Sequence, residues 1–417
     1  MTGPRPAARA RRTVRALLRL APLTITGFMQ FSWFGSLAVS PDPYAIVRRD
    51  WHQFFETGHQ LVAGDLSAIY PRTFESGYFW LYPPYCIYLT APLGMLPEWW
   101  AYALCVVVEV LAVAGALALL RAALPARGED HTTAAIVILA SMPFNTSVVI
   151  GQISGMLSLI LAASLWAWRR RRTLVAGLLL SLLFIKPNLA IFFVAASLLA
   201  RQWRVLAGMG LGGATMVLGS LPLGLERWHE YVRTSRDYVT VVQNKTLMWK
   251  QLTLYAFWRT ATGGTSSDLA VVAPWLASVA VVLGVTMLAW WRRRDSEAAL
   301  PRLFGLTVLL AVSANMYVYF YDGLVLLVPG VVWWVLRDEY RSRWRHALIG
   351  ACLLGIFVVG YLRIFLTSEG INWAGALIAI WLVCEAVDLL ARTDETTYRV
   401  DSAPDQHGIT VAPVTEP

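Results

Sequence analysis

Two charged residues have the types and surroundings expected of a catalytic or binding site. Asp50 follows Arg48 and Arg49 and begins a stretch with aromatic residues at near-helical spacing, so its carboxylate could serve as a general base. It could also be a solvated residue paired with either arginine. Lys186 interrupts a long apolar stretch, where an ionisable residue indicates function. It could bind a phosphate, with Arg49 as a second candidate, or it could reach the outer interface of a membrane.

Further polar residues stand at the junctions between apolar stretches. Gln152 follows Gly151, so its amide could line a sugar site or cap a helix. Asp322 could bind a substrate or a cation, or it could cap the next helix. Asp65 follows Gly64, a pair that favours a turn or a helix cap. The candidate substrate-binding residues are His52, Asp65, Tyr82, Gln152, Asn188, Tyr321 and Asp322.

The sequence lacks the motifs of several other chemistries. It has no P-loop, no GxGxxG after a strand and no HExxH pattern, and its six histidines show no metal-ligand spacing. The four cysteines have no CxxC spacing and fall in or beside apolar stretches, which favours small hydrophobic residues over disulfide or metal roles. Nucleotide-driven transport and zinc chemistry are therefore disfavoured, and we expect no cofactor and no bound metal.

The elements that position these residues must lie in a membrane. Hydrophobic residues make up 57% of the 417-residue chain and charged residues only 15%, against about 25% in a soluble protein. The net charge of +9 comes from arginine clusters between apolar stretches, as the positive-inside rule predicts. Nucleic acid is therefore not an expected partner. Abundant arginine and alanine are typical of GC-rich bacterial genomes, so we expect a multi-pass protein of a bacterial inner membrane.

We predict an all-α protein with about twelve spanning helices. The segment from Tyr82 to Leu96 decides the topology, because it is apolar but carries several prolines. If it crossed the membrane, every later arginine cluster would lie outside, against the positive-inside rule. We therefore predict that it is re-entrant from the outer side. The predicted spans are 20–39, 98–120, 132–150, 152–168, a hairpin over 173–200, 205–224, 270–291, a hairpin over 303–336, 347–366 and 373–391.

This topology divides the chain into three parts with both termini in the cytoplasm. Residues 1–19 form a basic N-terminus, residues 20–391 the transmembrane domain, and residues 392–417 a polar tail expected to be disordered. The main outer segments are 40–97, with an interfacial helix over Asp50–Leu61, and a polar loop over 225–268. The candidate polar residues also fall on the outer side, so the site is expected to face the periplasm or exterior.

Several short motifs follow one another along most of the chain. They are Asp50-Trp51-His52-Gln53-Phe54 with Gly58; Gly64-Asp65-Leu66 with Tyr70-Pro71; Tyr82-Pro83-Pro84 with Ala91-Pro92-Leu93 and Leu96-Pro97; Gly151-Gln152; Ala176-Gly177 with Lys186-Pro187 and Arg201 to Arg204; and Tyr321-Asp322-Gly323-Leu324. In these motifs the chain resembles the polyprenol-phosphate-sugar-dependent glycosyltransferases of family 87, which include bacterial phosphatidylinositol-mannoside mannosyltransferases.

The resemblance implies the membrane GT-C fold and a catalytic aspartate in the first outer loop, which corresponds to Asp50. It also implies a lipid donor that carries a hexose, commonly mannose, on polyprenyl phosphate. Two positions depart from the family pattern. Ser313-Ala314-Asn315-Met316 stands where relatives often have a histidine, and Phe54-Phe55 stands where the first-loop motif usually has two tyrosines. These departures concern the sugar and the acceptor more than the reaction.

We therefore expect transfer of a hexose, with mannose as the first choice, to a glycolipid or polysaccharide acceptor. Asp50 would take the acceptor proton, Lys186 would hold the donor phosphate, and the anomeric centre would invert. A cavity beside the re-entrant segment would seat the lipid tail. Two alternatives remain open. One is a transporter or lipid flippase, which Lys186 and broken helices also suit; the other is a transferase that uses lipid-linked arabinose or glucose.

Overall fold

The computed structural model describes residues 50–391 apart from 68, 71–79, 125–127, 246–247, 266 and 366–369, together with the isolated residues 24 and 28. Within this part every regular element is helical, and the only β-type pairing is an isolated bridge between Gln251 and Tyr319. The prediction of an all-α protein is confirmed there. Most of the predicted first span, Arg49 and the tail from residue 392 lie outside the described residues.

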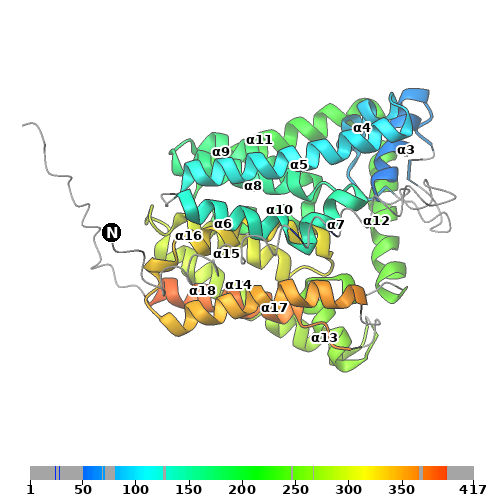
Figure 1. The fold of residues 1–417 in the computed structure, drawn as a ribbon. Coiled ribbons are helices and arrows are strands. Elements are labelled where there is room, and N and C mark those ends of the chain that lie inside the picture. Colours follow the sequence, from blue (N-terminus) through cyan, green and yellow to red (C-terminus); the bar gives the residue numbers. More distant parts are fainter. Residues whose placement is uncertain are drawn as a thin grey trace, which may run out of the picture.

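The helices follow one another with short connections (Figure 1). The α-helices are α3 (Asp50–Ala63), α4 (Ile87–Gly94), α5 (Glu98–Ala123), α6 (Gly128–Leu139), α7 (Met142–Ile150), α8 (Ser154–Arg169), α9 (Thr173–Ser181), α10 (Pro187–Leu199), α11 (Trp203–Ser220), α12 (Leu225–Lys245), α13 (Leu254–Thr262), α14 (Leu269–Arg293), α15 (Leu300–Ser313), α16 (Leu327–Val335), α17 (Arg343–Phe365) and α18 (Ala374–Leu390). Short 3₁₀ helices are η1 (Pro84–Cys86), η2 (Leu182–Ile185), η3 (Leu221–Leu223), η4 (Met248–Lys250), η5 (Phe320–Leu326) and η6 (Arg337–Glu339).

Three helices are long and apolar enough to cross a membrane. They cover Glu98–Ala123, Trp203–Leu223 and Leu269–Arg293, with 26, 21 and 25 residues. At a rise of about 1.5 Å per residue, each reaches at least the ~30 Å of a hydrocarbon core. Exposed apolar side chains such as Leu111 on α5 and Val281 on α14 suit contact with lipid. These helices confirm a membrane protein, and they match three of the predicted spans.

The predicted span over 132–150 is wrong in form, because two helices replace one. α6 and α7 meet at a break with a bend of 52°. Ser141 caps α7 by accepting a hydrogen bond from the backbone N–H of Phe144 at 3.4 Å, and Pro143 stands in the first turn. A proline has no N–H to continue the preceding helix but is well tolerated in a first turn. Counting the bent pair as one span gives up to four clear spans among the described residues.

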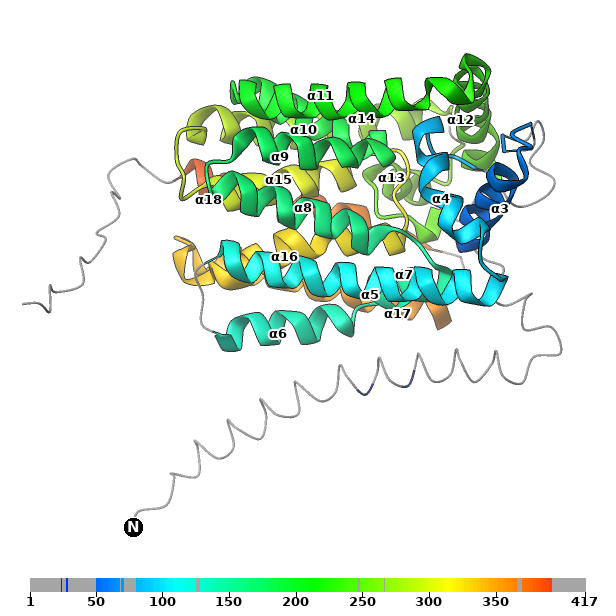
Figure 2. The ribbon, with the colours of Figure 1, turned by 90° about the horizontal axis from the view of Figure 1, so that it is seen from above.

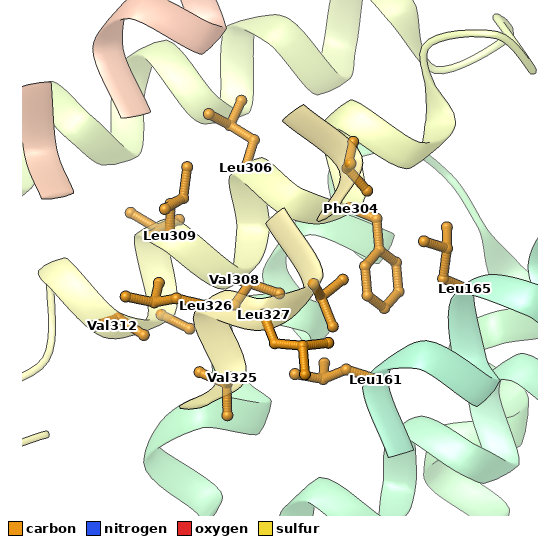
Figure 3. Close-up of a cluster of buried hydrophobic side chains, with 14 of the residues drawn as sticks. Leu161, Leu165, Phe304, Leu306, Val308, Leu309, Val312, Val325, Leu326 and Leu327 are labelled. Atoms are coloured by element: carbon orange, nitrogen blue, oxygen red, sulfur yellow. The ribbon is translucent and has the colours of Figure 1, made fainter. Parts of the chain in front are cut away.

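The two predicted hairpins consist of shorter apolar helices. The first contains Thr173–Ile185 and Pro187–Leu199, and the second contains Leu300–Ser313 and Phe320–Val335. The helices break at Lys186 and between Ser313 and Phe320, inside the two predicted hairpins. α15 is buried along its whole length, and Figure 3 shows its side chains packed against those of α8 and of the segment leading into α16. Apolar contacts from three elements thus form the centre of the bundle.

The polar loop predicted over 225–268 is also wrong, because most of it is helical. Leu225–Lys245 forms α12, and the residues it buries include Arg227, Thr234 and Tyr238. Their spacing of seven and four residues places them on one face of a helix. α13 then begins at Leu254 after the N-cap Thr253 and ends at Thr262, followed by the C-cap Gly263, whose φ is 68°. The mean hydropathy of residues 225–245 is low, which favours a loop in a membrane protein, although one face of this helix is buried.

The segment from Tyr82 to Leu96 is short and tightly packed. Its regular part is η1 and the eight-residue helix α4, which extends only about 12 Å and is too short for a span. α4 packs against α3 through glycines: a Cβ on Gly58 would lie 2.1 Å from the carbonyl oxygen of Thr90, and one on Gly94 would lie 2.1 Å from the carbonyl carbon of Gly58. The two helix backbones therefore touch directly.

The arginine-rich connections come together at one end of the bundle. Arg171 pairs with Glu297 at 2.7 Å, and Arg337 pairs with Asp130 at 3.0 Å. Arg341 donates to the carbonyl oxygen of Ala391 at 2.9 Å, so the last helix also ends there. α3, α4 and α12 lie at the opposite end (Figures 1 and 2). The two ends are called below the basic end and the α3 end.

Candidate active site

Asp50 is held by a side chain from a distant part of the chain. It is the first described residue of α3, and Gln152 donates a hydrogen bond from Nε2 to its Oδ2 at 2.6 Å. Gln152 in turn accepts from the hydroxyl of Tyr82 through Oε1 at 3.4 Å. Burial is the largest influence on the Asp50 carboxyl and raises its pKa, while the Gln152 hydrogen bond and the charge of Lys186 oppose that rise. A carboxylate with a raised pKa is a better proton acceptor.

The position of Gln152 follows from the turn that precedes it. Gly151 ends α7 in the left-handed conformation, with a φ of 65°, which glycine adopts without strain. A Cβ on Gly151 would also lie 2.3 Å from the Cβ of Trp51, so α3 packs closely on this turn. Trp51 itself is fully buried. The junction between α7 and α8 thus carries the amide directly to the start of α3.

Lys186 forms a buried ion pair with Asp322. The lysine lies at the break between η2 and α10, where its backbone is not helical (φ −122°, ψ 83°). Its Nζ contacts Oδ1 of Asp322, and the two side chains are 15% and 8% exposed. The ring of Tyr321 lies 5.5 Å from Nζ, within reach of a cation–π interaction. A cation and a carboxylate are thereby placed together beside Asp50, whose pKa both influence.

Asp322 caps the next helix, as one of its two predicted roles requires, and it also pairs with Lys186. Its Oδ2 accepts from the backbone N–H of Tyr319 at 3.4 Å, which caps η5. Its Oδ1 accepts from the hydroxyl of Ser154 at 3.2 Å and also pairs with Lys186. Ser154 stands two residues after Gln152, so one short segment binds both carboxylates. We call Asp50, Gln152, Lys186 and Asp322 the Lys186 cluster.

Other candidates take different positions. Asp65 is exposed and accepts from the backbone and side chain of Ser67 at 3.1 and 2.6 Å, which lowers the pKa of its carboxyl. It therefore forms a turn, as its sequence favours. The ring nitrogens of His52 lie 3.3 Å from Glu56 and 3.2 Å from Glu98. The geometry links neither Asp65 nor His52 to the Lys186 cluster.

Asn188 stands close to the cluster along the chain but bonds elsewhere. Its Nδ2 donates to Oδ1 of Asn315 at 3.3 Å, and Asn315 donates back to the carbonyl oxygen of Asn188 at 3.0 Å. This reciprocal pair ties the start of α10 to the end of α15. Asn315 is one of the residues that depart from the family pattern, and here it connects the turns of the two hairpins.

A cavity of about 250 Å³ opens beside the cluster. Its walls come from α3, η1, α4, α5 and the turn after α7. Most of its lining is apolar, and Tyr82, Gln152 and Glu109 add polar groups. The apolar lining residues include Phe54, Leu89, Pro92, Leu93, Leu104, Val108, Ile153, Met156 and Ile185. An apolar chamber next to a charged cluster suits a ligand with a hydrocarbon part and a polar head.

Sequence reasoning missed the aromatic side chains that α12 contributes. The hydroxyl of Tyr238 lies 3.1 Å from that of Tyr319, and the ring of Tyr231 lies 6.2 Å from that of Tyr70. Lys250, in η4, also lowers the pKa of Asp50 by its charge. The spacing of the aromatic residues on a helix was the available signal, and reading this stretch as a loop concealed it. Among the described residues no group of three His, Cys, Asp or Glu could hold a metal ion.

One comparison with known proteins gives a match. Residues 80–314, more than half of the 417-residue chain, match the model of Glycosyltransferase family 87. This range includes Tyr82, Gln152 and Lys186, whereas Asp50 precedes it and Asp322 follows it. A search of the curated proteins finds no match.

Proposed function

On the premise that this chain belongs to glycosyltransferase family 87 and is a glycosyltransferase, we propose that it transfers a hexose, in the first place mannose, from a polyprenyl-phosphate donor. The acceptor is a hydroxyl of a glycolipid or polysaccharide. One observation carries this proposal above the others. Gln152 binds Asp50 and also lines an apolar cavity, and the ion pair of Lys186 with Asp322 lies close enough to influence the pKa of Asp50.

Asp50 is the general base in this proposal. An acceptor hydroxyl attacks the anomeric carbon, its proton passes to the Asp50 carboxylate, and the bond between that carbon and the phosphate oxygen breaks. The electron pair of the broken bond leaves with polyprenyl phosphate. A single displacement inverts the anomeric centre. Gln152 fixes one carboxylate oxygen at 2.6 Å and leaves the other for the acceptor, which supplies the orientation that such a reaction requires.

Lys186 binds the donor phosphate. In the structure its ammonium group pairs with Asp322, which keeps a buried cation neutralised when no other anion is near. An ammonium group has three donors, so a phosphate oxygen can bind it while Asp322 holds one of them. The charge of Lys186 then offsets the negative charge that develops on the leaving phosphate.

The cavity beside the cluster receives the first part of the donor's lipid chain. Its apolar walls from α4 and α5 would contact isoprene units, and Gln152 and Tyr82 mark the inner side nearest the reacting groups. The positive-inside rule assigns the basic end to the cytoplasm. The α3 end and its site then face the periplasm, in the inner membrane of a bacterium, with both termini in the cytoplasm.

The decisive experiment is transfer in proteoliposomes that contain the purified protein. Polyprenyl-phosphate-[¹⁴C]mannose and extracted membrane lipids are supplied, and labelled glycolipid is separated from donor. We expect labelled product from the mannose donor, with parallel donors that carry glucose or arabinose giving less. Product only from another sugar would replace mannose and keep the reaction. Movement of intact donor across the bilayer without product would instead establish a flippase.

A second experiment tests the orientation. A cysteine introduced beside Gly64, at the exposed Ala63, in a variant without the four native cysteines, is treated with a membrane-impermeant maleimide in intact spheroplasts and in inverted vesicles. We expect labelling in spheroplasts and little in inverted vesicles. The reverse pattern would place the α3 end in the cytoplasm and overturn the assignment of the site.

A further inference from the structure

A second buried carboxyl group lies close to the site and has no part in the proposed reaction. Glu109 is in the middle of α5, an apolar helix long enough to cross a membrane, and only 1% of the residue is exposed. An ionisable group in such a position is costly to bury and needs hydrogen bonds. Its contacts therefore indicate what it does.

Glu109 binds both sides of the junction between α7 and α8. The hydroxyl of Ser147, in α7, donates to Glu109 Oε1, and the backbone N–H of Gly155, in the first turn of α8, donates to the same oxygen at 2.5 Å. The chain leaves room for the carboxyl group there: a Cβ on Gly155 would lie 2.8 Å from Cδ of Glu109.

The residues between these two contacts are the ones that organise the site. Gln152 holds Asp50, and Ser154 holds Asp322, the partner of Lys186. Trp51 packs on Gly151 from the opposite side. The junction is thus clamped between α3 and α5, and Glu109 supplies the polar half of the clamp.

We propose that Glu109 is a positioning residue: it fixes the junction between α7 and α8 so that Gln152 holds the base while Ser154 holds the counter-ion of Lys186. This inference rests on the proposed function. It predicts that loss of the carboxyl group displaces both contacts together, whereas loss of Gln152 alone displaces only one.

The test compares Glu109→Leu with Glu109→Gln in the mannose-transfer assay. Leucine removes the acceptor oxygen, and a misplacement of reacting groups by about 1 Å costs on the order of 100-fold, so kcat should fall by about that factor. Glutamine keeps an acceptor oxygen for Ser147 and Gly155, and we expect it to restore kcat to within about threefold of wild type. Leu111→Ala, on an exposed position of the same helix, is the matched control.

Two further readouts separate positioning from a general loss of structure. The acid side of the pH profile of Glu109→Leu should move to higher pH, because Asp50 then loses the hydrogen bond that lowers its pKa. The double variant Glu109→Leu with Gln152→Leu should lose little more activity than Glu109→Leu alone, since residues that act through one another are non-additive. Full additivity would overturn the proposal.

If Glu109→Leu does not accumulate in membranes, Ser147→Ala replaces it and should change kcat and the pH profile in the same direction by a smaller factor. A wild-type kcat and pH profile in whichever of the two variants is measured would overturn the inference. A different result would contradict the proposed function, namely an Asp50→Asn variant that still transfers sugar. An inactive Asp50→Asn with an unaffected Ser147→Ala would remove Glu109 from the account and leave Asp50 in place.

Discussion

Two buried charged clusters lie at opposite ends of this bundle and differ in how completely they are enclosed. At the basic end, Arg302 is 1% exposed and pairs with Glu385 and with Asp388 at 3.0 Å. Tyr340 donates its hydroxyl to Glu385, and its ring lies 4.1 Å from the guanidinium carbon of Arg302. We call these four residues the Arg302 cluster. It joins α15 to α18 and to the segment before α17.

The Lys186 cluster has fewer internal bonds and more space. The side chains of Lys186 and Asp322 are 15% and 8% exposed, and Gln152 of the cluster lines a cavity of about 250 Å³. The cavity beside Arg302 measures only about 10 Å³, room for about one water molecule. Buried charge alone therefore does not indicate a reaction site. The Lys186 cluster, where Gln152 lines a cavity and also binds a carboxylate, is therefore the one that we propose for function, whereas the Arg302 cluster holds helices together.

The largest effect that this comparison predicts is the loss of kcat in the variant Asp50→Asn. An amide cannot accept the acceptor proton, and loss of a general base lowers kcat by about 10² to 10⁴. Transfer assays at saturating donor measure it, and thermal unfolding in detergent should be unchanged. Asp65→Asn, at an exposed turn on the same outer segment, serves as the control and should keep wild-type kcat. Full activity in Asp50→Asn would remove the base from the proposal.

Arg302→Met is expected to lower stability and leave kcat nearly unchanged, the reverse of what Asp50→Asn should do. It leaves two buried carboxyls without their cation, which destabilises a protein by about 3–5 kcal/mol, while kcat per folded molecule stays near wild type. Unfolding in detergent and active-site-normalised rates measure the two quantities. Arg171→Met, which breaks an exposed pair with Glu297, should change stability little. A fall in kcat with unchanged stability would show that the comparison assigns the clusters wrongly.

Lys186→Met should mainly weaken use of the donor. Loss of a charge-assisted hydrogen bond costs about 1.5–3 kcal/mol, so we expect the donor KM to rise about 10- to 100-fold and the acceptor KM to stay nearly constant. Lys250→Met removes a second cation near Asp50 that packs on Trp249, and its effect on the donor KM should be smaller. Equal effects of Lys186→Met on both substrates would contradict a phosphate contact.

The smallest expected effect is a shift in pH dependence. In the proposed reaction Asp50 accepts a proton only when ionised, so activity should fall as pH drops through its pKa, which burial raises above the usual aspartate value. Gln152→Leu removes the hydrogen bond that lowers this pKa, and the acid limb of kcat/KM should therefore move to still higher pH. An unmoved limb would mean that another group controls the profile.

The sequence identified much of the Lys186 cluster for a physical reason. A lysine or a glutamine beside apolar stretches stands out locally, and the helix breaks at Lys186 and Gly151 are marked by proline and glycine. The structure brings Asp50, Gln152, Lys186 and Asp322 together, although their chemical roles remain a proposal. His52 and Asp65 stand in the motifs of the family resemblance, but the side-chain contacts described above for both lie elsewhere.

The sequence did not reveal the Arg302 cluster, because its partners are distant in the chain. Arg302 was counted with the arginines expected at the cytoplasmic surface, but Glu385 lies 83 residues away and Asp388 lies 86 residues away. Only tertiary packing decides that these groups meet. α12 was missed for a related reason. Its hydropathy is low, and its buried face is explained only by tertiary contacts with the segment after α3, with η1 and with the turn of the second hairpin.

The glycine contact between α3 and α4 bears on how a long lipid could reach the cavity. Gly58 and Gly94 bring the two backbones together and leave no gap there for a hydrocarbon chain to pass. On the other side of α4, Leu89, Leu104 and Val108 line the cavity and are also exposed on the outer surface of the bundle. A tail that slides in sideways past these residues never has to leave the surrounding leaflet. The enzyme would then sense only the isoprene units nearest the phosphate and tolerate carriers of very different length.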